Sequence, residues 1–273
     1  MHSPCFPLRA GSLARVQQPP AQPRWALCAG GDAIGSVVPA VADALALSLP
    51  PASDVKVLKI ELKSQYHIAL DGFFASNLTA AFGVLADTLR AQGLSGPWRH
   101  ECLPVANTAG RTVAQVERGV VRVLGLRTQA VHLVGLRPDG AVWVQQRSFS
   151  KPNDPGLWDT LMGGTVAGSE TVADTLTRET WEEAGLHLSA LGDLTHHGHF
   201  TATRPVPDGG GAGYLVEDTH WVTATVPGGL EPINQDGEVD HFECWPPERV
   251  REAVAQGLFT PEAAWVLTQV LGH

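Results

Sequence analysis

Residues Gly164–Leu186 read GTVAGSETVADTLTRETWEEAGL and contain the strongest structural signal in the chain. Apolar positions at helical spacing predict a helix over Val172–Ala184. Ser169 or Thr171 can cap its first turn, because a side-chain oxygen at that position accepts a free backbone N–H. Gly185 can end the helix, since glycine adopts the left-handed backbone conformation at little cost. The segment therefore predicts a loop followed by a helix with defined ends.

The predicted helix places three carboxylates on one face. At ~100° per residue, Glu179, Glu182 and Glu183 lie within about 100° of one another. Like charges this close repel each other, and the same face overlaps the apolar stripe near Leu176. Partly buried carboxylates need a cation, and an all-oxygen site selects a hard ion such as Mg²⁺ or Mn²⁺. Arg178 borders the cluster and can bind one carboxylate through two hydrogen bonds.

The segment matches, without a gap, the Nudix box G-x5-E-x7-R-E-U-x-E-E-x-G-U, in which U is an apolar residue. The matching positions are Gly164, Glu170, Arg178, Glu179, Glu182, Glu183, Gly185 and Leu186. Thr180 departs from the pattern at the first apolar position. Identities at this fixed spacing have a chance probability of roughly 10⁻⁸ per start point, which disfavours the alternative of a solvated acidic helix. The chain therefore resembles the Nudix hydrolases.

This resemblance implies an α+β fold, a Nudix α/β/α sandwich around a mixed sheet. It also implies hydrolysis of a diphosphate linked to another moiety, with Mg²⁺ or Mn²⁺ as cofactor. The implied metal ligands are the three glutamates of the helix face and the backbone carbonyl of Gly163. Arg178 would orient the glutamates, and Glu170 would support the junction of loop and helix. The metals would neutralise the diphosphate and lower the pKa of a bound water.

The catalytic base stays open between residues inside and outside the motif. Inside it, Glu179 or Glu183 can take the proton of the attacking water. Outside it, Glu238 is the candidate, and a solvated residue at a strand end is the alternative interpretation. Arg147 and Lys151 precede the motif, and their positive charge suits phosphate binding. For Lys151, an ordinary loop lysine is the alternative.

A closer resemblance extends beyond the motif over most of the chain. Its motifs are Trp98-Arg99-His100-Glu101, Glu117-Arg118, His132-Leu133-x-Gly135, Arg147-Ser148, Pro155-Gly156-x-x-Asp159 and Asp236-Gly237-Glu238-Val239. They resemble the Nudix proteins called thiamine pyrophosphokinase-related, in which Asn is usual at the position of Val134. The resemblance implies hydrolysis of thiamine diphosphate, or of its oxidised analogues, to the monophosphate. Asp159 is a predicted substrate contact, and Trp158 offers a ring face for stacking, against the alternative of core packing.

The chain of 273 residues is long enough for two domains. Residues 1–24 are rich in Pro, Gln, Ser and Arg, and predict a flexible arm. Residues 25–125 predict a small α+β domain, with a helix over residues 113–124, and residues 126–273 predict the Nudix domain. The sequence leaves open whether residues 25–125 form a wall of the substrate pocket, a homodimer contact, or both.

Composition excludes several other classes of protein. The formal net charge of −9 opposes a nucleic-acid partner. No run of ~18 apolar residues is long enough to cross a membrane, and no secretory signal is recognised. The four cysteines have no paired spacing, which favours free thiols and a cytoplasmic location. The chain has more arginine than lysine, and it is rich in Ala and Val. This composition is typical of proteins encoded by GC-rich bacterial genomes.

Two alternatives compete with hydrolysis of thiamine diphosphate. One is a Nudix hydrolase for another small-molecule diphosphate, such as an ADP-sugar, a dinucleotide or coenzyme A. The other is a Nudix-fold binding module without catalysis. Because all four glutamates of the motif are present, the second alternative is disfavoured.

Overall fold

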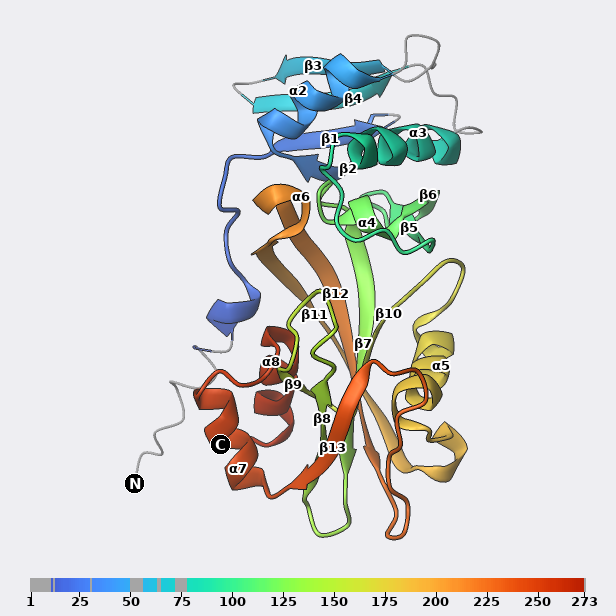
Figure 1. Cartoon of the computed structure of the whole chain (residues 1–273), viewed down its shortest axis with the longest axis vertical. Helices are drawn as coiled ribbons and strands as arrows, with labels where there is room; N and C mark the ends of the chain where they lie inside the picture. The colour runs from blue at the N-terminus through green and yellow to red at the C-terminus, as the bar shows by residue number, and fades with distance from the viewer. Residues whose placement is uncertain are drawn as a thin grey trace.

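The computed structural model describes residues 11, 13–29, 31–49, 56–62, 65–71 and 78–272. Two β-sheets lie at opposite ends of the molecule, and a short hairpin lies between them (Figure 1). The helices that flank the larger sheet come from the second half of the chain. None of the helices in these ranges is both long and apolar enough to span a bilayer.

The smaller sheet belongs to the first part of the chain. Its elements are β1 (Trp25–Ala29), β2 (Asp32–Val37), α2 (Pro39–Ser48), β3 (Lys56–Leu62), β4 (Gln65–Asp71) and α3 (Leu78–Ala91). The strand order is β2-β1-β4-β3, in which β1 and β4 are parallel. Leu27, Leu45 and Phe82 are fully buried in one core, so α2 and α3 pack against this sheet.

The predicted helix over residues 113–124 is wrong for most of its length. This segment contains the strand β6 (Thr112–Glu117), which pairs with β5 (Cys102–Ala106), and then one helical turn, α4 (Arg118–Val121). Ala114 and Val116 are buried whereas Gln115 between them is exposed, which is the period-two pattern of a strand. Pairing with β5 satisfies the backbone here, so the tertiary partner overrides a helical pattern.

The larger sheet is mixed, as predicted. Its elements are β7 (Arg127–Leu136), β8 (Val142–Arg147), β9 (Trp158–Asp159), β10 (Met162–Thr165), α5 (Val172–Ala184), the 3₁₀ turn η2 (Leu188–Ala190), β11 (Gly192–Val206), α6 (Asp208–Gly211), β12 (Gly213–Thr225), β13 (Val239–Trp245), α7 (Pro247–Ala255) and α8 (Pro261–Val270). The main path is β11-β12-β7-β8-β13, with β10 on β7 and β9 on β8. β12 and β7 run parallel, and the other pairs are antiparallel.

Helices cover both faces of the larger sheet (Figure 1). Leu133 and Trp143 pack with Leu176 of α5 on one face. Val134 and Val144, the neighbours of those two sheet residues, pack with α7 and α8 on the other face. Successive side chains of a strand point to opposite faces, so an apolar run in β7 serves both layers. The predicted Nudix α/β/α sandwich is therefore confirmed.

The predicted flexible arm, residues 1–24, lies partly outside the described residues. Its described part is packed against the larger sheet: Val16 is fully buried beside Ala202 and Leu215. Gln17 forms a parallel bridge with Thr203. The contacts of Val16 and Gln17 therefore depart from the prediction of a loose segment, which otherwise stays a prediction. The division of the chain at residues 125 and 126 stays a prediction.

Candidate active site

Helix α5 begins and ends as its sequence predicts. Thr171 is the cap: its side chain accepts the backbone N–H of Asp174, and the Asp174 side chain accepts that of Thr171. This reciprocal pair satisfies two free donors of the first turn. Gly185 has the left-handed backbone conformation, with φ of 64°. The two ends fix where the acidic face of the helix lies.

Two glycines of β10 bring the sheet into contact with α5. The backbone N–H of Gly163 donates to Glu183 Oε2 at 3.0 Å. At Gly164, a Cβ atom would lie 2.3 Å from Cγ of Glu179, so the glutamate occupies the space of a side chain. The close approach requires glycine at position 164, which gives a physical reason for the first residue of the motif.

Glu183 is the most buried acid of the motif, with 1% of its surface exposed. Besides the Gly163 N–H, it accepts hydrogen bonds from Gln145 at 2.9 Å and from Lys151 at 3.3 Å. Burial raises the pKa of Glu183, and the charge of Lys151 and the two other hydrogen bonds oppose this rise. Its carboxylate is thus fixed in position by three donors from three different segments.

Glu179 lies one helical turn before Glu183, and the two carboxylates repel each other. Burial and the charge of Glu183 raise the pKa of Glu179 to about 7, although Arg178 opposes the rise. A cation bound by both carboxylates would stabilise their charged forms, because it offsets their burial and their mutual repulsion. The electrostatic cost of this pair is the kind of cost that a bound metal ion removes.

Arg178 links the remaining acids of the motif. Its guanidinium group binds both carboxylate oxygens of Glu170, at 2.7 and 2.8 Å. The same group donates to Glu179 at 2.9 Å and to Glu182 at 2.8 Å. Glu170 thus joins the loop before α5 to the second turn of the helix, as the resemblance implies.

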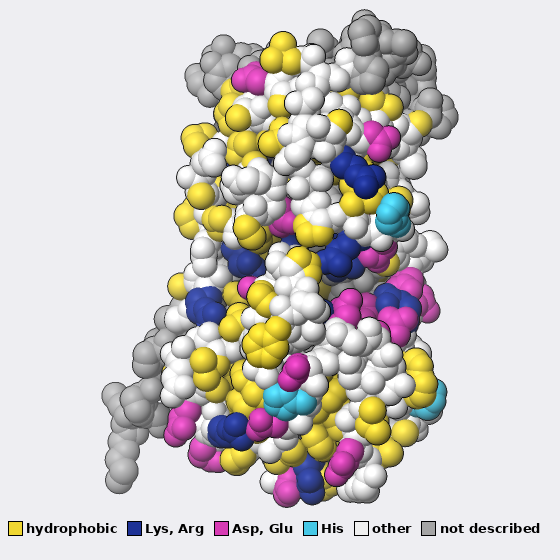
Figure 2. Space-filling view, viewed as in Figure 1, with side chains coloured by type: hydrophobic (Ala, Val, Ile, Leu, Met, Phe, Trp, Pro, Cys, Tyr) yellow, Lys and Arg dark blue, Asp and Glu magenta, His cyan; other side chains and the backbone are white. Residues whose placement is uncertain are grey.

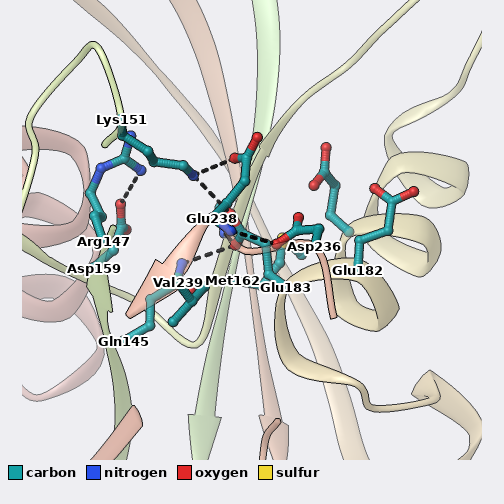
Figure 3. A network of polar contacts seen from close by, with 12 residues as sticks. Gln145, Arg147, Lys151, Asp159, Met162, Glu182, Glu183, Asp236, Glu238 and Val239 are labelled. Atoms are coloured by element: carbon teal, nitrogen blue, oxygen red, sulfur yellow. Dashed lines mark hydrogen bonds and ion pairs between the residues drawn. The ribbon is translucent and has the colours of Figure 1, made fainter. Parts of the chain in front are cut away.

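Lys151 and Glu238 close the site from the loop side (Figure 3). Lys151 Nζ lies 2.5 Å from Glu238 Oε2 and 3.3 Å from Glu183 Oε1, so one cation bridges the two acids. Burial opposes the charged form of Glu238, but the hydrogen bond and charge of Lys151 outweigh it and lower the pKa of this carboxyl. About half of the Glu238 side chain is exposed, so it remains accessible at the rim.

The other predicted substrate contacts divide into two groups. Arg147 and Asp159 line the cavity, but they bind each other at 3.4 Å. Asp159 is also 3.4 Å from His132. Trp158 is not among the residues that line the cavity; it packs on Trp245, with ring centroids 4.4 Å apart. Its position thus favours the alternative of core packing over ring stacking.

The cavity beside α5 is rich in charge of both signs. Its lining includes the cations Arg99, Arg118, Arg122, Arg147, Lys151 and Arg204. Figure 2 shows Lys and Arg side chains at mid-height on this face of the molecule. The first three arginines lie in the segment between α3 and β7, so the first part of the chain forms a wall of this cavity.

Several residues of this cavity are not among the site residues that the sequence predicts. Arg99, Arg118 and His132 lie within quoted family motifs, which was the available signal for them. Arg204 and Glu217 had no such signal, since they lie in β11 and β12, far from the motif in sequence.

The donor set of α5 fits a hard divalent cation. Among the described residues, no group of three or more His, Cys, Asp or Glu side chains is already arranged as a metal site. The reason is visible in the contacts: Arg178 draws Glu179 and Glu182 toward itself, and Lys151 holds Glu183. All three acids nevertheless offer oxygen atoms only, which is the chemistry that Mg²⁺ and Mn²⁺ prefer.

The chain is similar to proteins from plants and bacteria. It is 28% identical to Nudix hydrolase 24, chloroplastic, of Arabidopsis thaliana, over 66% of this chain and 50% of the relative. It is 30% identical to an isopentenyl-diphosphate Delta-isomerase of Corynebacterium glutamicum, over 50% of this chain and 70% of that protein. The chain thus spans about half the length of the plant hydrolases it matches.

Solved structures and a family model agree with this similarity. The crystal structure of DR0079 from Deinococcus radiodurans superposes with a TM-score of 0.50 at 22% identity, covering 62% of this chain and 98% of that one. The model of the NUDIX domain matches residues 126–263, which is half of the chain and includes α5 with all its acids. The chain therefore belongs to the Nudix domain family.

Proposed function

We propose that the chain is a metal-dependent pyrophosphohydrolase that cleaves the diphosphate of thiamine diphosphate, or of its oxidised analogues, to the monophosphate and phosphate. The cofactor is Mg²⁺ or Mn²⁺. The proposal rests on one observation: acids of α5 and several cations line the same cavity. Glu179 and Glu183 line the same cavity as Arg99, Arg118 and Lys151. A diphosphate needs cations around its oxygens and a metal site beside its phosphorus atoms.

Each acid of the motif has a distinct task in this proposal. Glu179, Glu182 and Glu183, with the Gly163 carbonyl, would hold the metal. When bound, the metal would neutralise the diphosphate and acidify a water. Glu170 and Arg178 position the helix acids, because their two-point contact fixes the guanidinium group beside the cluster.

Glu238 is the base that we favour. It lines the cavity, it is not part of the helix cluster, and Lys151 keeps its carboxylate charged and oriented. Glu179 and Glu183 remain the alternatives, but their carboxylates are needed as metal ligands in the same proposal. A base must be free to accept a proton while the ligands stay bound.

The diphosphate itself would lie against the cations of the cavity. Arg147 is held by Asp159 and by the backbone carbonyls of Asn153 and Asp154, so it offers a fixed positive charge. Arg99 has no carboxylate partner among the described residues, which leaves its guanidinium group available for phosphate oxygens. The N-terminal part of the chain thus supplies a phosphate contact in this proposal.

The thiamine part of the proposal is supported by the family motifs quoted above. The plant relatives are named as Nudix hydrolases without a substrate, and the bacterial relative is named for isopentenyl diphosphate. A substrate panel separates the candidates: thiamine diphosphate, an oxidised analogue, ADP-ribose and isopentenyl diphosphate, each with Mg²⁺. We expect kcat/KM to be highest for thiamine diphosphate or its oxidised analogue.

Two variants make the panel decisive. Glu183→Gln should abolish release of phosphate, whereas Glu252→Gln, an exposed acid of α7, should leave it unchanged. Turnover of ADP-ribose far above both thiamine compounds would contradict the substrate class. Absence of turnover of any diphosphate, by a folded wild type loaded with Mg²⁺ or Mn²⁺, would favour a binding module instead.

A further inference from the structure

The charges that line the cavity are paired, with two exceptions. Arg118 contacts Glu101, Arg122 contacts Asp208, and Arg204 contacts Asp154 and Glu262. The pairs of Arg147, Lys151 and the α5 acids are described above. Within the described part of the chain, only Arg99 and Glu217 line the cavity without an ion-pair partner. Their situations differ, because Arg99 is exposed and Glu217 is buried.

Glu217 lies in β12, in the middle of the larger sheet. It is opposite Thr128 of β7 in the strand register, and 8% of its surface is exposed. Its Oε2 accepts a hydrogen bond from the Thr128 hydroxyl group at 3.1 Å. Across the described ranges, no donor bonds to its Oε1, and this atom is not among the fully enclosed polar atoms, because Glu217 lines the cavity. Isolated buried carboxylates are rare, because removal from water disfavours the charge unless a partner compensates it.

The surroundings of Glu217 add to this cost. Burial and the nearby charge of Glu262 raise the pKa of Glu217, and Arg122 opposes the rise without contacting the carboxylate. Arg204 is not available to Glu217, because it already binds the carboxylate of Glu262. The group that would satisfy Glu217 must therefore enter from the cavity, and it must be a hydrogen-bond donor or a cation.

We propose that Glu217 recognises the non-phosphate part of the substrate, through a nitrogen-bearing group that is positively charged or donates an N–H. This inference rests on the proposed function for the diphosphate end of the ligand. The cavity then has two selective regions: the α5 acids and the cations for the diphosphate, and Glu217 for the nitrogenous moiety. Thiamine diphosphate carries a cationic thiazolium and an amino group, whereas isopentenyl diphosphate carries neither. An apolar prenyl chain would leave Glu217 buried without a charged partner.

The kinetic test compares Glu217→Gln with Asp218→Asn. Asp218 is the next residue of the same strand, on the opposite face, where it pairs with Arg127 outside the cavity. With thiamine diphosphate and Mg²⁺, Glu217→Gln should raise KM by about 10- to 100-fold, the range for loss of a charged hydrogen bond, with kcat little changed. Asp218→Asn should leave both constants unchanged. A wild type that hydrolyses isopentenyl diphosphate as efficiently as thiamine diphosphate would overturn the inference.

A binding test keeps the inference separate from catalysis. Thiamine monophosphate is titrated calorimetrically into wild type, Glu217→Gln and Asp218→Asn without metal. Affinity lost only in Glu217→Gln supports the inference even if no diphosphate is hydrolysed, in which case the proposed function alone fails. Equal affinity in all three proteins overturns the inference, and hydrolysis of thiamine diphosphate by the wild type would still stand.

Thermal unfolding separates recognition from a structural role. Removal of an unpaired buried charge should leave the melting temperature of Glu217→Gln equal to that of the wild type, or raise it. A clear fall in melting temperature together with a fall in kcat would mean that Glu217 supports the fold, and would overturn the inference.

Discussion

The backbone of Gly164 lies so close to Glu179 that the glutamate side chain fills the place of a Cβ atom, with Cγ only 2.3 Å from the ideal position of that atom. Gly164 belongs to β10 and Glu179 to α5, so the contact sets the distance between sheet and helix at the acidic cluster. The glycine at the start of the motif and the glutamate fifteen positions later are thus one structural unit.

Substitution of Gly164 by alanine tests this contact. The added methyl group must displace Glu179, and a displacement of about 1 Å at a catalytic group costs roughly 100-fold in rate. We expect kcat/KM for the diphosphate substrate to fall by about that factor while the far-UV spectrum stays native. Gly228→Ala is the matched control, because a Cβ there meets no atom within 4 Å. Unchanged kinetics in Gly164→Ala would contradict the assigned position of Glu179.

Metal binding should be visible in stability as well as in activity. A ligand that binds only the folded state stabilises it in proportion to the logarithm of its concentration. Burial and the repulsion by Glu183 together raise the pKa of Glu179 to about 7, and a bound Mg²⁺ would offset both effects. We expect the melting temperature to rise with MgCl₂ concentration in the wild type and to stay constant in Glu183→Gln. KCl at equal ionic strength is the control, and an identical response to both salts would contradict a metal site.

The local part of the site could be predicted from the sequence. The bounds of α5, its capping by Thr171 and the ending at Gly185 depend on residues within one segment, as does the contact of Arg178 with Glu170. Local hydrogen bonds and helical spacing are enough to determine these features. The predicted mixed sheet between helices follows from the family resemblance and is confirmed.

The rest of the cavity depends on pairings between distant segments. Glu217 reaches the site because β12 lies parallel to β7, and no periodicity in either strand specifies that neighbour. Arg99 reaches it because the first part of the chain packs over the larger sheet. The same limitation explains the error at residues 113–124, where pairing with β5 decided the structure. These features depend on which distant strands pair and in which register, and local sequence propensity does not specify that pairing.

Arg99 provides a test of the contribution of the N-terminal part of the chain. Arg99→Gln removes the cavity cation that has no carboxylate partner among the described residues. If its guanidinium group binds the diphosphate, KM should rise by about 10- to 100-fold, as for loss of a charge-assisted hydrogen bond. Arg111→Gln, in the exposed turn between β5 and β6, is the control. Equal KM values in the two variants would show that Arg99 has no contact with the substrate.

The buried pair of Asp159 and His132 predicts how stability depends on pH. Burial favours the neutral acid, but His132, Arg147 and the Thr160 N–H outweigh it and lower the pKa of Asp159 to about 2 from 3.8. Burial likewise opposes the charged imidazole, but the hydrogen bond and charge of Asp159 raise the pKa of His132 above 6.5. The contribution of Asp159 is thus present above pH 3.8 and is lost as the pH falls toward 2. That of His132 is present below pH 6.5 and is lost as the pH rises through its folded pKa.

Asp159→Asn should therefore be most destabilising between about pH 4 and 6.5, where both charges are present in the folded state. The Asp159 shift alone corresponds to about 2 kcal/mol in the free energy of unfolding. Urea unfolding of wild type and variant from pH 2.5 to 8 measures the difference at each pH. Asp139→Asn, at the exposed turn after β7, should give a difference near zero throughout. A destabilisation by Asp159→Asn that stays constant across this range would show that the pair does not titrate as its burial and hydrogen bonds require.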